Sequence, residues 1–354
     1  MASMNHEASF VEIGAMHGSL SMFSEATLIA QIAALAERSA EDVILGIGDD
    51  AAIIRKNEQQ WWLLSIDSQI ENIHFQRHYT PPRMLGHKAL AVNLSDIAAM
   101  GGTPRFALLS LSLPKDTEPS LVEELLAGML ALADQHATTL VGGDITASLS
   151  GLTLTLTIIG ECAAGRALRR AGARPGDWIF VTGRLGLAAI GLRLLQHGYR
   201  FAPELPAHLQ QPILAHLQPT PRLEVGRALA ERQLATALID ISDGLSTDLH
   251  HICQASGVGA VIHAADLPIV KELPQEAHLT ALDAALNGGE DYELLFTVAP
   301  EDVGQIESLR AQLGDLPITM IGEITNEPGR VSLEQAGTLT PLLPRGHDHL
   351  RREG

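Results

Sequence analysis

The sequence predicts a fold of mixed helices and strands, either α+β or α/β, arranged in two halves. Apolar strand patterns and helical patterns alternate along the chain. A segment after Glu161 is rich in Gly, Ala and Arg and lacks apolar periodicity, so it separates two such alternations. The length of 354 residues also suits two domains or one large one, and 46% hydrophobic residues provide a sizeable core.

The first half contains one helix and several strands that the pattern defines clearly. Residues 53–67 read as a hairpin around a polar turn, residues 82–100 as a helix and residues 105–114 as a strand. A capping box of Ser120 and Glu123 predicts the start of the next helix. Residues 138–144 form a short strand that ends in glycines, and residues 152–161 alternate Leu or Ile with Thr at period two.

The second half repeats the alternation. Strands are predicted at residues 178–183, 236–240 and 292–298, and helices at residues 187–198 and 244–257. A Pro-rich passage runs through Pro221, and a helix then extends to about Arg232.

Composition limits the class of protein. A formal net charge of -18 argues against a nucleic-acid binder, which needs a basic surface. The two cysteines, Cys162 and Cys253, are far apart and suggest a reducing compartment. No apolar run is long enough for a membrane span, and residues 1–20 lack the pattern of a signal peptide. We therefore expect a cytoplasmic protein with a loose N-terminal extension over residues 1–20.

Carboxylates recur where apolar strands end in turns that contain Gly or Ser. Strand ends near glycine turns are common places for sites in layered α/β structures. The "NGGED" segment gives the mirror case, because its glycines and acids lead into a strand. The residues of this pattern are Asp49, Asp50, Asp67, Asp144, Asp240, Asp243, Glu290 and Asp291.

Asp96 differs from these acids because it lies inside the helix "KALAVNLSDIAAMGG", which is apolar on nearly all sides. Such a helix is usually buried. Asn93 and Asp96 are three residues apart and share a face. A buried carboxylate at this place needs a cation or several hydrogen-bond donors.

Each of these acids also has a simple structural explanation. A lone Asp after a strand commonly forms a turn or caps a helix, so Ser242 or Asp243 could cap the helix near Gly244. As a group, the acids outnumber their candidate basic partners. Several carboxylates without thiolate or histidine ligands favour a hard cation, Mg²⁺ or Mn²⁺, and several Mg²⁺ ions imply a phosphate-rich ligand such as ATP. The candidate basic partners are Lys88, Arg105, Arg169 and Arg170.

Other sequence signals are weak. The P-loop pattern G-x-x-x-x-G-K-[ST] does not occur, so this is not a P-loop enzyme. The adjacent His250 and His251 are expected to be solvated. His74 follows the strand of Asp67 and could reach a substrate phosphate.

At these residues the sequence resembles the thiamine-monophosphate kinase family, within the superfamily of aminoimidazole ribonucleotide synthetases. The resemblance extends in the family's order from about Ser24 to the C-terminus. Its most specific motifs are "KALAVNLSDIAAMG" and "GGEDYELLFT". The others are "GIGDDAA", "HF" at His74–Phe75, "GGD" at Gly142–Asp144, "GRALRRAGARPGDWIFVTG" and "DISDGLSTDL".

The resemblance implies an α+β fold of two domains, each a mixed sheet covered by helices. Residues 21–163 would bind ATP and Mg²⁺ and would pair in a homodimer, and residues 164–354 would complete the active site. The implied reaction is ATP-dependent phosphorylation of thiamine phosphate to thiamine diphosphate by direct in-line transfer. Neither nucleic acid nor membrane is an implied partner.

The resemblance also implies roles for individual residues. Asp67, Asp96 and Asp144 would be catalytic, and His74, Glu290 and His347 would contact thiamine phosphate. Gly143, Asp144, Arg170 and Ser242 would contact ATP. The implied metal ligands are Asp50, Ser65, Ile66, Asp67, Asp96, Asp144, Asp240 and Asp243.

Three positions depart from the family pattern. Ile66 removes a hydroxyl, so that ligand would either become a backbone carbonyl or be lost, and "GGDIT" replaces the usual "GGDTT". His347 stands where the family commonly has a Tyr beside the substrate ring.

The alternatives to a thiamine-phosphate kinase are another ATP-dependent synthetase of the superfamily, a two-metal phosphohydrolase, or a non-catalytic nucleotide-binding relative. Successive side chains of an extended segment point to opposite sides, so Asp49 and Asp50 are expected to have different roles. The resemblance assigns the metal to Asp50; Asp49 is then expected to bond the turn, with a role behind the metal ligands as the alternative.

Overall fold

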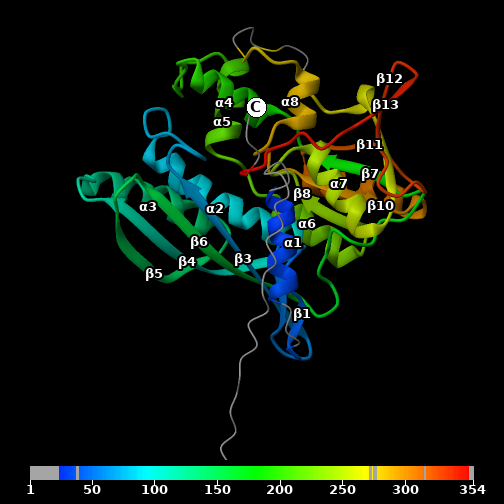
Figure 1. Cartoon of the computed structure of the whole chain (residues 1–354), viewed down its shortest axis with the longest axis horizontal. Helices are drawn as coiled ribbons and strands as arrows, with labels where there is room; N and C mark the ends of the chain where they lie inside the picture. Colours follow the sequence, from blue (N-terminus) through cyan, green and yellow to red (C-terminus); the bar gives the residue numbers. More distant parts are fainter. Residues whose placement is uncertain (1–23, 37–39, 271–272, 274–276, 315, 351–354) are drawn as a thin grey trace, which may run out of the picture. The chain divides into compact units, whose positions relative to one another are not determined.

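The computed structural model describes residues 24–36, 40–270, 273, 277–314 and 316–350 (Figure 1). The predicted extension at residues 1–20 lies outside them. The chain divides into two units, and residues 38–347 belong to the larger one. The smaller unit contains helix α1 (Glu25–Leu35), which the sequence did not predict. Ser24 caps α1 by accepting a hydrogen bond from the backbone N–H of Thr27, and the backbone N–H of Glu25 donates to Asp348 of the same unit.

The N-terminal half of the larger unit builds a six-stranded mixed sheet. The strand order is β1-β2-β3-β6-β4-β5, with β4 and β5 parallel and the other pairs antiparallel. Helices α2 and α3 pack together, and α2 also contacts β3 and β6. The elements are β1 (Val43–Leu45), β2 (Ala52–Arg55), β3 (Gln60–Ile70), α2 (Pro82–Ala99), β4 (Thr103–Pro114), α3 (Pro119–Gln135), β5 (Thr139–Ser148) and β6 (Thr153–Ala163).

The C-terminal half builds a seven-stranded sheet in the order β13-β12-β9-β11-β7-β10-β8, in which only the β12–β9 pair is parallel among the described strands. Its strands are β7 (Trp178–Thr182), β8 (Ala235–Asp240), β9 (Gly259–His263), β10 (Leu294–Val298), β11 (Ile318–Thr325), β12 (Val331–Gln335) and β13 (Thr338–Pro341). Its helices are α4 (Leu187–Gln196), α5 (Ala207–Leu217), α6 (Leu223–Arg232), α7 (Leu245–Ser256), α8 (Ala281–Asn287) and α9 (Val303–Leu313), with short 3₁₀ turns at η2 (Ala264–Asp266) and η4 (Pro300–Asp302).

Two mixed sheets, each covered by helices, confirm the predicted α+β fold (Figure 1). The hairpin and the period-two strand are also confirmed. Residues 52–55 pair with residues 61–64. Along β6, Leu154, Leu156 and Ile158 are buried while the intervening threonines are partly exposed. This alternation is the expected pattern of a strand with one face on a core.

Helix α2 joins the two halves. Its Gly86 lies so close to α3 that an added Cβ would come within 1.8 Å of the Leu125 carbonyl oxygen. At its other end, a Cβ on Gly226 of α6 would come within 2.0 Å of the Ala98 carbonyl oxygen. One buried apolar cluster includes residues of both halves, among them Leu94 of α2. The predicted boundary between residues 163 and 164 stays a prediction.

Several local predictions were wrong. Helix α3 begins at Pro119 with Glu118 at its N-cap, so Ser120 does not cap it. Proline suits the first helical position because its φ is already fixed, and this starts the helix two residues earlier than a cap at Ser120 would. Strand β5 continues past its glycines to Ser148. The Pro-rich passage contains helix α5 with Pro212 inside it, because tertiary packing against α4 outweighs the local cost of proline. The elements α8, α9, β9, β11, β12 and β13 were not predicted.

None of the helices in the described ranges combines the length and the apolar character that crossing a lipid bilayer requires.

Candidate active site

Four of the predicted carboxylates come from four separate elements and lie near one another. Asp50 lies in the loop before β2, Asp67 on β3, Asp96 on α2 and Asp240 at the end of β8. Helix α2 connects two of the other elements directly. Ser95 Oγ donates a hydrogen bond of 2.5 Å to Asp240 Oδ2, and Asp96 Oδ2 accepts one of 2.5 Å from Ser65 Oγ of β3.

The carboxylates of this group oppose one another's ionisation. Burial raises the pKa of Asp96 well above its usual value, and the charges of Asp67, Asp240 and Asp50 raise it further. Burial and then the charge of Asp50 raise the pKa of Asp240 to about 8. A divalent cation among these side chains would remove the repulsion and allow all of them to ionise at neutral pH.

Arg170 places a positive charge beside this group. Its Nη2 lies 2.5 Å from Asp50 Oδ1, and its Nε lies 3.1 Å from the same oxygen. Burial raises the pKa of Asp50, while Arg170 acts against the rise. The neighbouring Asp49 accepts hydrogen bonds from the backbone N–H groups of Asp50 and Arg170, so the expected turn-bonding role of Asp49 is confirmed.

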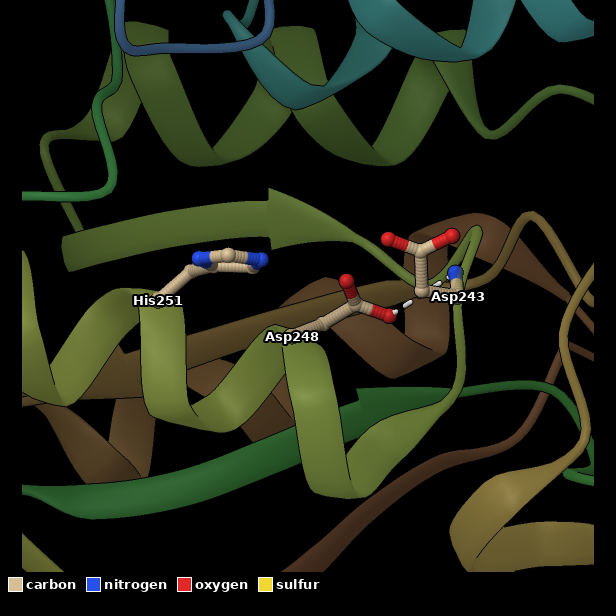
Figure 2. Close-up of side chains that lie close together, drawn as sticks. All are labelled: Asp243, Asp248 and His251. Atoms are coloured by element: carbon tan, nitrogen blue, oxygen red, sulfur yellow. Dashed lines mark hydrogen bonds between the residues drawn. The ribbon is translucent and has the colours of Figure 1, made fainter. Parts of the chain in front are cut away.

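Asp243 lies beside two residues that the sequence did not assign to a site (Figure 2). Within the described part of the chain, Asp243, Asp248 and His251 are the three metal-ligating side chains whose ligand atoms all lie within 4.8 Å of one another. Asp248 accepts hydrogen bonds from the backbone N–H groups of Asp243 and Gly244. It is this carboxylate that stabilises the start of α7, so the explanation of Ser242 or Asp243 as a helix cap is wrong.

His250 and His251, which were expected to be solvated, are both partly exposed and also make contacts within the protein. His250 Nδ1 lies 2.6 Å from the Ser246 carbonyl oxygen of α7. Burial lowers the pKa of His251 to about 4, and the charges of Arg170 and His250 contribute. His251 therefore presents a neutral imidazole, the form that can bind a metal ion.

Glu290 is held by two buried basic side chains from other elements. Its Oε1 lies 2.6 Å from Lys88 Nζ of α2, and its Oε2 lies 3.1 Å from His216 Nδ1 of α5. Its backbone N–H donates to the carbonyl oxygen of Ser242. Burial alone would raise the pKa of Glu290, but Lys88 and His216 lower it far below its usual value.

Gly143 and Asp144 lie apart from the carboxylate group within one chain. Asp144 of β5 is in register with Ser110, which is in register with Thr155 and Ser68. Ser68 of this row directly follows Asp67 on β3. The side chains of the row therefore point to the face of the sheet opposite to that of Asp67. Three strand spacings of about 4.8 Å also separate β3 from β5, which is roughly 14 Å.

The side chain of Ile66 also points away from the carboxylate group. It lies between Ser65 and Asp67 on β3 and is 64% exposed on the opposite face of the sheet. Its predicted part in metal binding, through the backbone carbonyl, stays a prediction.

The remaining predicted residues lie in loops around the group. His74 Nδ1 accepts a hydrogen bond from the backbone N–H of Ile70, which fixes the ring at the end of β3. The backbone N–H of His347 donates to the carbonyl oxygen of Asp243, so the C-terminal part of this unit lies against the Asp243 loop.

Sequence reasoning missed several residues of this region. Tyr292 is buried. Burial, and then the charges of Glu290, Asp67, Asp240 and Asp96, raise the pKa of its hydroxyl, so this side chain lies near the acids. The sequence assigned no role to Ser95 of α2, and it gave Lys88 only as a candidate basic partner of the acids. The position of Ser95 next to Asp96, and that of Lys88 inside an apolar helix, could have indicated these two residues. His216 carried no comparable signal.

The donor set fits a hard divalent cation. Asp50, Asp67, Asp96 and Asp240 offer only oxygen atoms, which Mg²⁺ prefers. Asp50 Oδ2 is buried and has no hydrogen-bond partner among the described residues. A buried carboxylate oxygen without a donor is costly unless a cation satisfies it.

The chain is similar to known proteins in both halves. The model of the AIR synthase related protein, N-terminal domain, matches residues 48–162, and that of the C-terminal domain matches residues 174–334. The two sheets and the acids between them therefore define a protein of the AIR synthase related class.

Individual relatives narrow this class. A thiamine-monophosphate kinase of Salmonella typhimurium is 42% identical over 328 residues, which are 92% of this chain and 98% of that protein. AaThiL complexed with AMPPCP and TMP has a TM-score of 0.80 at 34% identity, covering 95% of this chain and all of that one. The crystal structure of thiamine-monophosphate kinase from Stenotrophomonas maltophilia K279a has a TM-score of 0.73 at 40% identity. The match covers 89% of this chain and 98% of that one. The chain belongs to the thiamine-monophosphate kinase family, which confirms the predicted resemblance.

Proposed function

We propose that this protein uses ATP to phosphorylate thiamine phosphate to thiamine diphosphate. One observation carries the proposal: four carboxylates from both halves of a thiamine-monophosphate kinase chain, Asp50, Asp67, Asp96 and Asp240, converge beside Arg170. AaThiL, which has a TM-score of 0.80 with this chain, is complexed with AMPPCP, an ATP analogue, and TMP.

The reaction needs positioning and charge neutralisation more than acid–base chemistry. A phosphate monoester has its second pKa near 6, so its attacking oxygen is already largely deprotonated at neutral pH. The difficulty is repulsion between two anionic phosphates, which a site removes by placing cations around them. Arg170 offers a guanidinium at the carboxylate group, and the rigid elements β3, α2 and β8 hold the acids in place.

We propose Asp50, Ser65, Asp67, Asp96 and Asp240 as holders of Mg²⁺, with Ile66 contributing a backbone carbonyl and Asp243 holding a further ion. Mg²⁺ supplies neutralisation of the phosphate charges when it is bound. The repulsion that raises the pKa of Asp96 and Asp240 supports this assignment. Ser242 lies in the turn that carries Asp243, which suits its proposed contact with ATP.

For the thiamine phosphate we propose contacts with His74, Glu290 and His347. Glu290 is fixed by two side chains and by the Ser242 carbonyl oxygen, so it offers a preorganised acceptor. His347 is held beside Asp243 through its backbone, which supports a place at the edge of the same site.

A homodimer formed through the N-terminal sheet is part of the proposal. The face of this sheet opposite α2 carries exposed Phe106 and Leu108, which alternate with buried Ala107 and Leu109 on β4, and Ile66 of β3 lies on the same face. Exposed apolar patches of this kind mark interaction surfaces.

The same face also carries Asp144. In a homodimer, Gly143 and Asp144 would act on the nucleotide bound by the other copy, which accounts for their distance from Asp67 within one chain. On this proposal, residues 21–163 bind nucleotide and pair, and residues 164–354 complete the site.

A cytoplasmic location follows from the same proposal, because ATP is a cytoplasmic substrate. Both cysteines are free and buried, which suits a reducing compartment.

The test is a coupled product assay. Purified protein is incubated with ATP, MgCl₂ and thiamine phosphate, and both ADP and thiamine diphosphate are quantified by chromatography. The expected result is one thiamine diphosphate per ADP, and loss of both products in EDTA. Unphosphorylated thiamine and the Asp96→Asn variant serve as controls. ADP without thiamine diphosphate, or turnover that persists in EDTA, contradicts the proposal.

A further inference from the structure

Lys88 is an unusual residue for its position. It lies on the apolar helix α2 and its side chain is 1% exposed. Lysine is almost never fully buried unless it is paired, because removing an ammonium group from water is costly. Its partner is Glu290, with 2.6 Å between Nζ and Oε1. Lys88 is the first residue of the motif "KALAVNLSDIAAMG", but the family resemblance implies no role for it, and it is not part of the carboxylate group.

The pair links two parts of the site. Lys88 and Asp96 are eight residues apart on α2, which places them about 12 Å apart along the helix axis. Glu290 belongs to the loop between α8 and β10, and its backbone bonds the Ser242 carbonyl oxygen of the Asp243 turn. The contact therefore connects the helix of a metal-binding candidate with the loop of a substrate-binding candidate.

Glu290 needs this support because its backbone is strained. Its φ is +69°, a left-handed conformation that residues other than glycine seldom adopt. Such a conformation persists where surrounding contacts hold it, and it often occurs at functional sites. Lys88 on one carboxylate oxygen and His216 on the other are the contacts that hold the side chain.

The three side chains also balance in charge. Burial lowers the pKa of His216, and the charge of Lys88 lowers it further, so the imidazole is neutral. Glu290 is ionised because Lys88 and His216 outweigh the effect of burial on its pKa. One negative and one positive charge thus cancel, and Glu290 is an ion-paired carboxylate and not an uncompensated anion.

We propose that Lys88 and His216 are positioning residues for thiamine phosphate, because they fix Glu290 in one orientation and tie its loop to α2. This inference rests on the proposed function. Neither residue needs to touch the substrate. Their removal frees the Glu290 side chain, so binding of thiamine phosphate weakens while binding of ATP, at the carboxylate group, changes little.

The test compares variants by the KM for each substrate and by the increase in melting temperature that thiamine phosphate alone produces. Lys88→Met is expected to raise the KM for thiamine phosphate about tenfold or more, the effect of losing one charge-assisted contact, and the KM for ATP less than twofold. His216→Leu is expected to act in the same direction. His216→Asn keeps a nitrogen donor near the Nδ1 position and is expected to restore much of the affinity.

A double-mutant cycle separates positioning from general structural support. If Lys88 acts through Glu290, adding Lys88→Met to Glu290→Gln has little further effect on the KM for thiamine phosphate. The double variant also removes both charges of the pair, so it keeps the test available if Lys88→Met alone does not fold. Lys56→Met is the matched control, because Lys56 forms a 2.5 Å ion pair with Glu161 and has no proposed part in the site.

The outcomes are distinct. Equal increases in both KM values, or additive effects in the cycle, overturn the positioning role. A wild-type protein that shows no increase in melting temperature with thiamine phosphate and makes no thiamine diphosphate overturns the proposed function itself. Wild-type binding that Lys88→Met and His216→Leu leave unchanged overturns the inference alone.

Discussion

Replacing Asp240 by Asn tests the idea that the carboxylate group is built to hold a cation. Asp240 is 3% exposed and accepts a 2.5 Å hydrogen bond from Ser95 Oγ. Asparagine has nearly the same shape, and its amide oxygen can accept the same hydrogen bond. The substitution therefore removes the negative charge and leaves the packing in place.

The magnitude follows from the pKa of Asp240. Burial, and then the charge of Asp50, raise this pKa from 3.8 to about 8. At about 1.36 kcal/mol per pKa unit, the ionised Asp240 costs the folded protein at most about 6 kcal/mol. Because the pKa is raised in the folded protein, protonation of Asp240 stabilises the fold. That stabilisation is fully present below about pH 4 and is lost as the pH rises towards 8.

The assay is thermal unfolding in EDTA between pH 5 and pH 8. Metal-free Asp240→Asn is expected to be more stable than the metal-free wild type at pH 8, by several kcal/mol or on the order of 10 °C in Tm. The difference should shrink as the pH falls. Saturating Mg²⁺ should raise the Tm of the wild type more than that of the variant, because the wild type binds the ion more tightly.

Asp177→Asn is the matched control. Asp177 is also buried, but it accepts hydrogen bonds from the Arg174 backbone N–H and from Thr236 Oγ1. Its replacement should destabilise the protein throughout this pH range. If metal-free Asp240→Asn is instead less stable than the wild type at pH 8, Asp240 is a structural acceptor and the explanation by charge repulsion is refuted.

Three further substitutions test other parts of the structure. Asp96→Asn should lower kcat/KM roughly 100-fold or more while circular dichroism shows an intact fold, and full activity would remove Asp96 from the site. Gly86→Ala should lower the free energy of unfolding in urea by about 3 kcal/mol, because its Cβ would lie 1.8 Å from the Leu125 carbonyl oxygen; an unchanged midpoint would contradict this packing. Leu108→Glu should shift the protein towards monomer in sedimentation velocity, and an unaltered dimer would place the interface elsewhere.

The elements with strong local patterns could be predicted from the sequence. The strand of alternating Leu and Thr was predicted from its period of two. The helix of Asp96 was predicted from a long stretch that is apolar on nearly all sides. Helix α5 was missed because its proline argued against it, and only packing against α4 made the helix favourable. The edge position of β5 is likewise a property of the whole sheet.

The sequence by itself determined which residues can do the chemistry: acids at strand ends, an acid in an apolar helix, and the motifs of a kinase family. The tertiary structure decided which of them meet. Ser95 and Asp240 are 145 residues apart in sequence and 2.5 Å apart in space, and Lys88 reaches Glu290 from the other half of the chain. Asp144, by contrast, lies on the far face of its sheet from Asp67. Local periodicity records which side of an element a residue occupies, whereas contacts between distant elements depend on how the whole core packs.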